Sequence, residues 1–264
     1  MNVTRANGVQ LHFAVEGPAD KPVIVFSNSL GTDFRMWDRL VSRFDGRFRM
    51  VRYDKRGHGL SEATSRPYAI DDHVADLIGL LDHLKLERII LCGLSVGGLI
   101  AQGVAARQPE RLSALILCDT AAKIGTPEMW GDRMAAIEKG GIEALADPIM
   151  ERWLSADFRT NKPEESLAWR NMLTRTTLDG YLGTCAAIRD ADLRESTRQL
   201  KLPVLGIVGS EDGATPPDLV RGTIESIAGA RFEIIEGAGH LPSIEKPEVM
   251  DALITGFLKE NGLV

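Results

Sequence analysis

The stretch that decides the fold is Ile89-Ile90-Leu91-Cys92-Gly93-Leu94-Ser95-Val96-Gly97-Gly98. It begins as a short apolar strand, passes through G-x-S-x-G at residues 93–97, and continues as an apolar helix that we expect to end at 107, before Pro109. A serine on a tight turn between a strand and a helix is a nucleophile elbow, and its small neighbours prevent clashes. We therefore predict that Ser95 is a catalytic nucleophile. The alternative is a glycine-rich turn in which Ser95 only caps the helix.

Short apolar runs recur before and after this stretch and alternate with helical patterns. Runs that are hydrophobic throughout are typical of buried strands in a parallel sheet, and we expect them at 23–26, 49–53, 89–92, 115–118, 204–208 and 232–235. Residues 10–15 alternate polar and apolar side chains, which favours an antiparallel edge strand. Helices are expected at 71–84, 96–107 and 247–259. This alternation predicts the α/β class, with a mostly parallel, doubly wound sheet.

The segment 121–200 breaks this rhythm. It has no convincing strand, its composition is helical, and it contains Trp130, Trp153 and Trp169, three of the four tryptophans. Open α/β sheets bind ligands outside the carboxyl ends of their strands, where an inserted segment can cover them. We therefore divide the chain into a core, residues 1–120 and 201–264, and a helical cap or lid, residues 121–200. The alternative is a helical subdomain with a packing role only.

A serine nucleophile needs a base, and His240 is best placed to supply it. The sequence Gly-Ala-Gly-His at 237–240 follows the last expected strand, so His240 lies in a loop at the same carboxyl edge as Ser95. His58 follows the strand that ends at 53 and is the alternative base. The remaining histidines are assigned to the edge strand (His12) and to the solvated surface of a helix (His73 and His83).

The acid that orients the base should stand between Ser95 and His240, since folds of this kind use the order Ser, Asp or Glu, His. We assign Asp212, which follows the strand 204–208 in Gly-Ser-Glu-Asp-Gly. A buried carboxylate there would hold the imidazole tautomer and stabilise the imidazolium. Glu211 and Asp119, which follows another strand, are the alternatives.

An oxyanion hole needs two backbone N–H groups. One is expected from Val96, the residue after the nucleophile. The other is expected from the loop Ser-Asn-Ser-Leu-Gly at 27–31, which follows the strand 23–26, and we assign it to Leu30.

Composition disfavours several other classes of protein. A chain of 264 residues with net charge −6 and no basic run is a poor partner for nucleic acids or anionic membranes. The odd number of cysteines is not typical of a disulfide framework, and Cys92 and Cys118 are interpreted as small buried hydrophobes. No signal-peptide segment, membrane span or metal-ligand motif such as H-E-x-x-H is present, so we expect a cytoplasmic protein without cofactor or metal. The sequence does not predict the oligomeric state.

The motifs and their order resemble the α/β-hydrolases throughout the chain, and more narrowly the 3-oxoadipate enol-lactonases of the β-ketoadipate pathway. Tyr-Asp-Lys-Arg-Gly-His-Gly-Leu-Ser at 53–61 and the elbow at 92–98 indicate only the superfamily. The loop Ser-Asn-Ser-Leu-Gly-Thr at 27–32 is more specific, because many relatives carry His-Gly in place of Asn28-Ser29. The segment 119–125, Asp-Thr-Ala-Ala-Lys-Ile-Gly, continuing to Trp130 and Arg133, also resembles the enol-lactonases.

This resemblance implies that the substrates are 3-oxoadipate enol-lactone, an anion, and water. Rival hydrolases are a general carboxylesterase and an enzyme that cleaves carbon–carbon bonds of ring-cleavage products, since both could use the same triad. A ligand-binding protein with a retained hydrolase pocket is the non-enzymatic alternative.

The implied anionic substrate needs a local cation, because the net charge of −6 gives no long-range attraction. Trp130 and Arg133 are three residues apart, so on a helix they share one face. We expect the Trp130 side chain to pack beside the lactone ring while Arg133 binds the carboxylate of the substrate. The alternatives are Lys123 and Arg189, or an Arg133 that is only solvated while Trp130 packs inside the cap.

Overall fold

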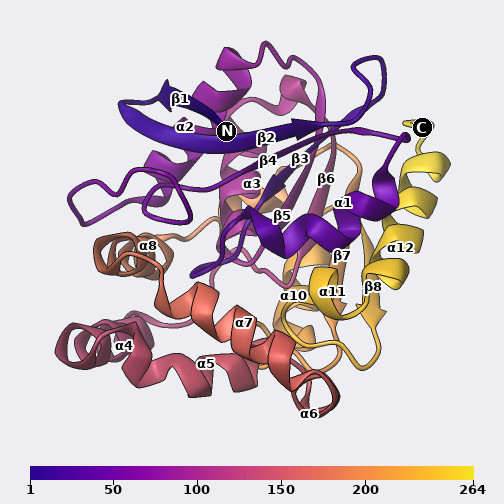
Figure 1. Ribbon diagram of the computed structural model, residues 1–264. Coiled ribbons are helices and arrows are strands. Elements are labelled where there is room, and N and C mark those ends of the chain that lie inside the picture. Colours follow the sequence, from indigo (N-terminus) through magenta and orange to yellow (C-terminus); the bar gives the residue numbers. More distant parts are fainter.

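The apolar runs predicted as strands form the centre of one eight-stranded sheet, in a computed structural model that describes residues 1–264 (Figure 1). The strand order is β1-β2-β4-β3-β5-β6-β7-β8, and every pair from β4 to β8 is parallel. The prediction of a mostly parallel, doubly wound sheet is therefore confirmed. The strands are β1 Asn2–Ala6, β2 Val9–Glu16, β3 Val23–Ser27, β4 Arg49–Tyr53, β5 Ile89–Leu94, β6 Leu112–Cys118, β7 Val204–Gly209 and β8 Arg231–Ile235.

The expected edge strand at 10–15 is antiparallel, but the prediction that it forms the edge is wrong. Strand β2 lies between β4 and an additional strand, β1, and pairs antiparallel with both. The residues of β1 are mostly exposed and show no apolar run, which is why the sequence pattern missed it. The dipeptide Asn7-Gly8 could have indicated β1, because Asn-Gly favours the tight turn of a hairpin. In the structure both residues have positive φ, 48° and 78°.

Helices cover both faces of the sheet. Figure 1 shows α1 and α12 together on one face, and α2 and α3 together on the other. The predicted helices at 71–84, 96–107 and 247–259 are confirmed within one residue at each end. The helices are η1 Phe34–Trp37, α1 Asp38–Phe44, α2 Ile70–His83, α3 Val96–Arg107, η2 Pro109–Arg111, α4 Pro127–Gly140, η3 Ile142–Leu145, α5 Ala146–Trp153, α6 Ala156–Asn161, α7 Pro163–Thr174, α8 Leu178–Asp190, α9 Arg194–Arg198, α10 Pro217–Ile224, α11 Pro242–Glu245 and α12 Pro247–Glu260.

The helices from α4 to α9, which we call the inserted helices, stand between β6 and β7 in the chain. In Figure 1, α4 to α8 form a separate group below the sheet. Proline at the first turn of α4 and α7 and side-chain caps from Thr126, Ser155 and Thr177 start four of these helices. The carboxyl ends of β5, β7 and β8 carry Ser95, Asp212 and His240 in the loops that follow them.

The expectation that His73 is solvated is wrong, whereas His83 is exposed as expected. His73 is 1% exposed, because α8 of the inserted helices packs on the face of α2 that carries it. Its Nε2 lies 3.4 Å from the hydroxyl of Thr184, and its ring meets the edge of Tyr68. Burial lowers the pKa of His73 well below its ordinary value, so the ring is neutral.

The other sequence-based expectations about the interior agree with the structure. Cys92 and Cys118 are fully buried on neighbouring strands with free thiols, and Cys185 is also buried and free. None of the helices combines the length and the apolar character that crossing a membrane would require.

Candidate active site

Ser95 lies on a strained turn between β5 and α3. Its φ of 58° is unusual for a residue with a side chain. The turn is fixed from both sides, since the Ser95 amide donates to the carbonyl of Cys118 (3.0 Å) and the Thr120 hydroxyl donates to the carbonyl of Ser95 (2.7 Å). The strand–turn–helix context predicted for the elbow is therefore present in the structure.

Where the backbone segments of the elbow approach one another most closely, no residue larger than glycine fits. A Cβ on Gly97 would lie 2.0 Å from the backbone oxygen of Ser27, and one on Gly93 would lie 2.2 Å from that of Gly97. Both contacts are with backbone, which cannot rotate away as a side chain can. Gly97 thus lets α3 approach the loop after β3.

We expect Gly97→Ala to lower the free energy of unfolding by about 3 kcal/mol, because it overpacks a site that cannot relax. The measurement is the urea midpoint. Gly256→Ala in α12 is the matched control, since its Cβ would meet no atom within 4 Å. The control should gain about 0.5–1 kcal/mol from helix propensity. Equal midpoints for the two variants would contradict this account of the elbow.

Asp212 and His240 form a buried hydrogen-bonded pair. His240 Nδ1 lies 2.9 Å from Asp212 Oδ2, which also accepts from the Thr215 hydroxyl (2.7 Å). The other oxygen of Asp212 accepts from the amides of Ala214 and Thr215. Burial disfavours the charged form of Asp212, but the charge and hydrogen bond of His240 outweigh it, together with the Thr215 donors, and lower the pKa of this carboxyl. Asp212 is therefore an ionised acceptor for the imidazole Nδ1–H.

Ser95 and His240 line one small cavity beneath the inserted helices. Its volume is about 50 Å³. Ser95 makes no side-chain hydrogen bond, and His240 Nε2 instead lies 3.5 Å from the hydroxyl of Ser29. Catalytic hydrogen bonds are often long without substrate and tighten in the complex. The lining residues are Ser29, Leu30, Ser95, Ile124, Met129, Trp130, Arg133, Arg152, Trp153, Ile188, Ala214, Thr215 and His240.

Two backbone amides beside the serine have no acceptor in the protein. Leu30 belongs to the cavity lining, and its N–H group takes part in none of the backbone or side-chain hydrogen bonds. Val96 is the first residue of α3, so its N–H group has no intrahelical partner. Both donors suit an oxyanion on the Ser95 side of the cavity.

The alternative acids differ from Asp212 in position or protonation. Glu211 is exposed, and its carboxylate accepts from the amide of Ala156 (3.4 Å). Asp119 is fully buried within 4.8 Å of both Asp212 and His240. Burial, followed by the charge of Asp212, raises the pKa of Asp119 well above its ordinary value, which favours the protonated form of its carboxyl group. These three groups lie close enough to hold a metal ion, but both Asp212 oxygens already accept hydrogen bonds.

His58, the alternative base, faces the back of the loop that carries Leu30. Its Nε2 accepts the amide of Gly31 (3.0 Å), and its Nδ1 donates to the carbonyl of Arg56 (3.1 Å). Burial, assisted by the charge of Lys55, lowers the pKa of His58 well below its ordinary value. Neither ring nitrogen is free to take a proton from a nucleophile.

The structure brings Arg133 and Trp130 of α4 to the cavity that contains Ser95. The guanidinium carbon lies 5.2 Å from the centre of the Trp130 ring, and Nη2 donates to the hydroxyl of Tyr181 (2.5 Å). The buried Nε of Arg133 has no partner, and no carboxylate pairs with the group. The sequence reasoning missed Tyr181, because nothing in its local pattern ties α8 to α4. It also missed Ser29 and Arg152 as lining residues.

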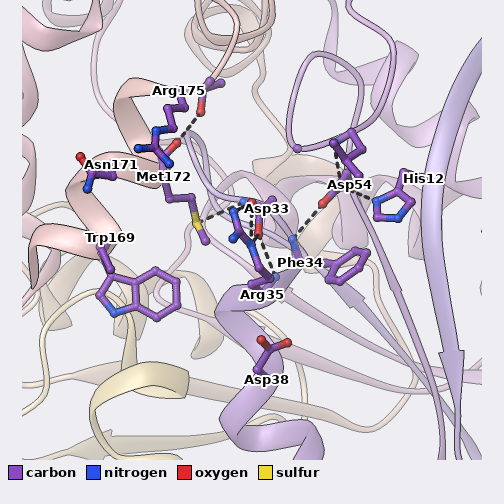
Figure 2. Close-up of a pocket in the computed structure, with 14 residues that line it drawn as sticks. His12, Asp33, Phe34, Arg35, Asp38, Asp54, Trp169, Asn171, Met172 and Arg175 are labelled. Carbon is purple, nitrogen blue, oxygen red and sulfur yellow. Dashed lines mark hydrogen bonds and ion pairs between the residues drawn. The ribbon is translucent and has the colours of Figure 1, made fainter. Parts of the chain in front are cut away.

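A larger cavity lies elsewhere in the molecule. It measures about 670 Å³ and lies between α7 and the start of α1, as Figure 2 shows with Trp169 and Met172 opposite Asp33 and Asp38. It contains neither Ser95 nor His240. Its buried carboxylates are already satisfied: Arg35 binds Asp33, and Asp54 accepts from His12 and two backbone amides. Size therefore does not identify the reactive site here.

Comparisons with known proteins agree with this geometry. Residues 19–253 match the model of the Alpha/beta hydrolase family, and the chain belongs to that family. The resemblance to 3-oxoadipate enol-lactonases is also confirmed. The chain is 35% identical over 259 residues to 3-oxoadipate enol-lactonase 1 of Acinetobacter baylyi, covering 97% of this chain and 96% of that protein. Enol-lactonase 2 of the same organism is 34% identical over 254 residues, with 96% and 95% covered.

Solved structures give the same result. The crystal structure of an enol-lactonase from Burkholderia xenovorans is 40% identical, with a TM-score of 0.94 and coverage of 98% of this chain and 100% of that one. A thermophilic esterase from Thermogutta terrifontis, solved with malate bound, is 28% identical with a TM-score of 0.92 and 99% of both chains covered. The protein is thus a hydrolase that is similar to enol-lactonases and esterases.

Proposed function

We propose that this protein hydrolyses 3-oxoadipate enol-lactone to 3-oxoadipate, in the degradation of aromatic compounds. The observation that carries the proposal is the Arg133 guanidinium, which has no carboxylate partner and lines the same cavity as Ser95 and His240. The lactone carries a carboxylate that such a group can bind through paired hydrogen bonds. Similarity to the two Acinetobacter enol-lactonases supports this choice among anionic esters and lactones.

In the proposed reaction, His240 takes the proton of Ser95 as the hydroxyl attacks the lactone carbonyl. Asp212 holds the imidazole with Nδ1–H toward its carboxylate, so that Nε2 is the base. The negative oxygen of the tetrahedral intermediate binds the amides of Leu30 and Val96. The ring then opens and leaves an acyl group on Ser95, and the expelled enolate takes a proton and becomes the ketone. Water activated by His240 releases the second carboxylate.

The inserted helices are proposed to act as a cap that moves during turnover. A cavity of about 50 Å³ holds a water molecule or two, whereas the lactone ring with its side chain is several times larger. Trp130 and Arg133 lie on α4, so a shift of this helix would enlarge the cavity and carry the carboxylate-binding group with it.

Arg133→Met tests the role of the guanidinium. For the enol-lactone we expect a loss in kcat/KM that corresponds to about 2–4 kcal/mol, because a charge-assisted contact to the substrate carboxylate is removed. For a neutral aryl ester of similar size, kcat/KM should barely change.

Arg189→Met is the matched control for the change in net charge. Arg189 pairs with Asp190, and the other alternative cation, Lys123, donates to the carbonyls of Arg189 and Ala191. Neither lines the cavity. Equal losses on both substrates would mean that Arg133 only holds α4 against Tyr181, and no loss on either would remove Arg133 from the site.

A general carboxylesterase is the second candidate, and the similarity to the Thermogutta esterase favours it. The two are separated by the substrate preference of the unmodified protein: an esterase would cleave the neutral aryl ester at least as efficiently as the anionic lactone.

A further inference from the structure

Lys55 is the one lysine among the buried residues, with 1% of its surface exposed. It lies in the loop after β4, and its ammonium group donates to the carbonyl oxygens of Ser29 and Thr32. It forms no ion pair. Burying an ammonium group costs free energy that a few hydrogen bonds offset only in part, and lysine is rarely buried for packing alone. The burial of this charge therefore indicates a functional role at the loop that Lys55 binds.

The loop in question is the one that carries the proposed oxyanion donor. The carbonyl of Ser29 and the amide N–H of Leu30 belong to the same peptide group. A hydrogen bond from a charged donor to the oxygen of a peptide polarises it, and its N–H becomes a stronger donor. The Leu30 N–H has no acceptor in the protein, and Leu30 lines the cavity with Ser95. The ammonium group of Lys55 and the proposed oxyanion donor are thus joined through one peptide group.

We propose that Lys55 is a positioning residue for the oxyanion hole, which holds the loop 29–32 from behind and polarises the Ser29–Leu30 peptide toward the developing oxyanion. The inference rests on the Ser95 centre of the proposed function, but not on the identity of its substrate.

Other contacts keep this loop in place when Lys55 is removed. The Thr32 hydroxyl donates to the Ser29 carbonyl (2.9 Å), and His58 accepts the amide of Gly31. The Ser29 carbonyl therefore keeps a donor in a Lys55 variant. We expect such a variant to fold and to lose polarisation rather than the loop itself.

The charge of Lys55 depends on pH near neutrality. Burial lowers the pKa of Lys55 to about 7, against the attraction of Asp54 and Asp33. The other groups that face it are His58 and His73, both neutral, and Arg56, which Asp76 pairs. The ammonium form is therefore present below about pH 7 and is lost above it. The proposal accordingly predicts that kcat falls as pH rises through this range.

The test is Lys55→Met, assayed with a neutral aryl ester below about pH 7, where the unmodified protein carries the ammonium form of Lys55. We expect kcat to fall about tenfold with KM within about twofold, which is less than the loss of an oxyanion donor itself. Affinity for phenylboronic acid, which forms a tetrahedral adduct with the serine, should fall by a similar factor, and the decrease of kcat above about pH 7 should disappear.

Lys123→Met is the matched control, because the half-buried Lys123 also donates to two backbone carbonyls but lies outside the cavity. It should leave kcat and boronate affinity unchanged. The proposal is overturned if Lys55→Met leaves both within about twofold, or if it raises KM alone. If the methionine variant does not fold, Lys55→Gln decides, and a kcat and a boronate affinity that both stay within about twofold of the unmodified protein reject the proposal.

Failure of the proposed function gives a different result from failure of this inference. If the protein cleaves the aryl ester but not the lactone, the substrate is wrong and the Lys55 test still stands. If Ser95→Ala keeps full ester cleavage, the catalytic centre itself lies elsewhere, and the Lys55 inference is rejected with it.

Discussion

Ser95→Ala is expected to lower kcat by a factor of about 10⁶ and to leave the fold intact, a magnitude known from the nucleophile of another serine hydrolase. The variant removes the oxygen that would form the acyl bond, while the methyl group still fits the turn between β5 and α3. The elbow bonds made by the Ser95 backbone with Cys118 and Thr120 also remain. The measurement is turnover of the lactone and of an aryl ester, with circular dichroism to verify folding.

Ser29→Ala is the informative control, since the Ser29 hydroxyl lies 3.5 Å from His240 Nε2. It tests whether the other serine beside the base is the nucleophile. We expect Ser29→Ala to keep most of the activity. If the activity of Ser95→Ala stayed within about tenfold of that of the unmodified protein, the assignment of Ser95 as the nucleophile would be contradicted.

Asp212→Asn should lower kcat by about 10⁴, the size of the same substitution in the serine-protease template. An amide in this place can present its NH₂ group to Nδ1 and so stabilise the wrong imidazole tautomer. It also removes the negative charge that stabilises the imidazolium while His240 holds the proton. The measurement is single-turnover kinetics on the aryl ester, which separates the chemical steps from product release.

Glu211→Gln and Asp119→Asn are the controls for this prediction. Glu211 is exposed and contacts the amide of Ala156, so its change should be nearly silent. Burial and the charge of Asp212 raise the pKa of Asp119 and favour its uncharged form, so an isosteric amide should change little there. If Asp119→Asn were the more damaging substitution, the acid of the triad would belong after β6 instead of β7.

The centre of the fold could be predicted from the sequence because each buried strand repeats one simple physical signal. Strands between helices on both faces of a sheet are apolar on both sides, as in Leu115 to Cys118. The elbow, Asp212 and His240 each follow a predicted parallel strand, which places their three loops at one edge of the sheet. In the structure, the side chains of Asp212 and His240 lie 2.9 Å apart. The edge strand β1 was missed because its residues are mostly exposed and carry no such signal.

The remaining features depend on contacts between distant segments, which leave little trace in the local sequence. His73 is buried because α8 covers α2, and Tyr181 meets Arg133 across two inserted helices. The partners of Lys55 are backbone carbonyls, which every residue has, so no pattern predicts them. Lysine is also mostly exposed in proteins, so the sequence alone argues against its burial.

The value of kcat/KM for purified 3-oxoadipate enol-lactone, measured beside that for a neutral aryl ester, tests the central proposal most directly. We expect the lactone to be hydrolysed with kcat/KM above about 10⁴ M⁻¹s⁻¹, within the usual range of enzymes on their own substrates. We also expect this value to exceed that of the aryl ester by about a hundredfold, which the contact between Arg133 and the substrate carboxylate would supply. Efficient cleavage of the aryl ester with no turnover of the lactone above the uncatalysed rate would contradict the proposed function.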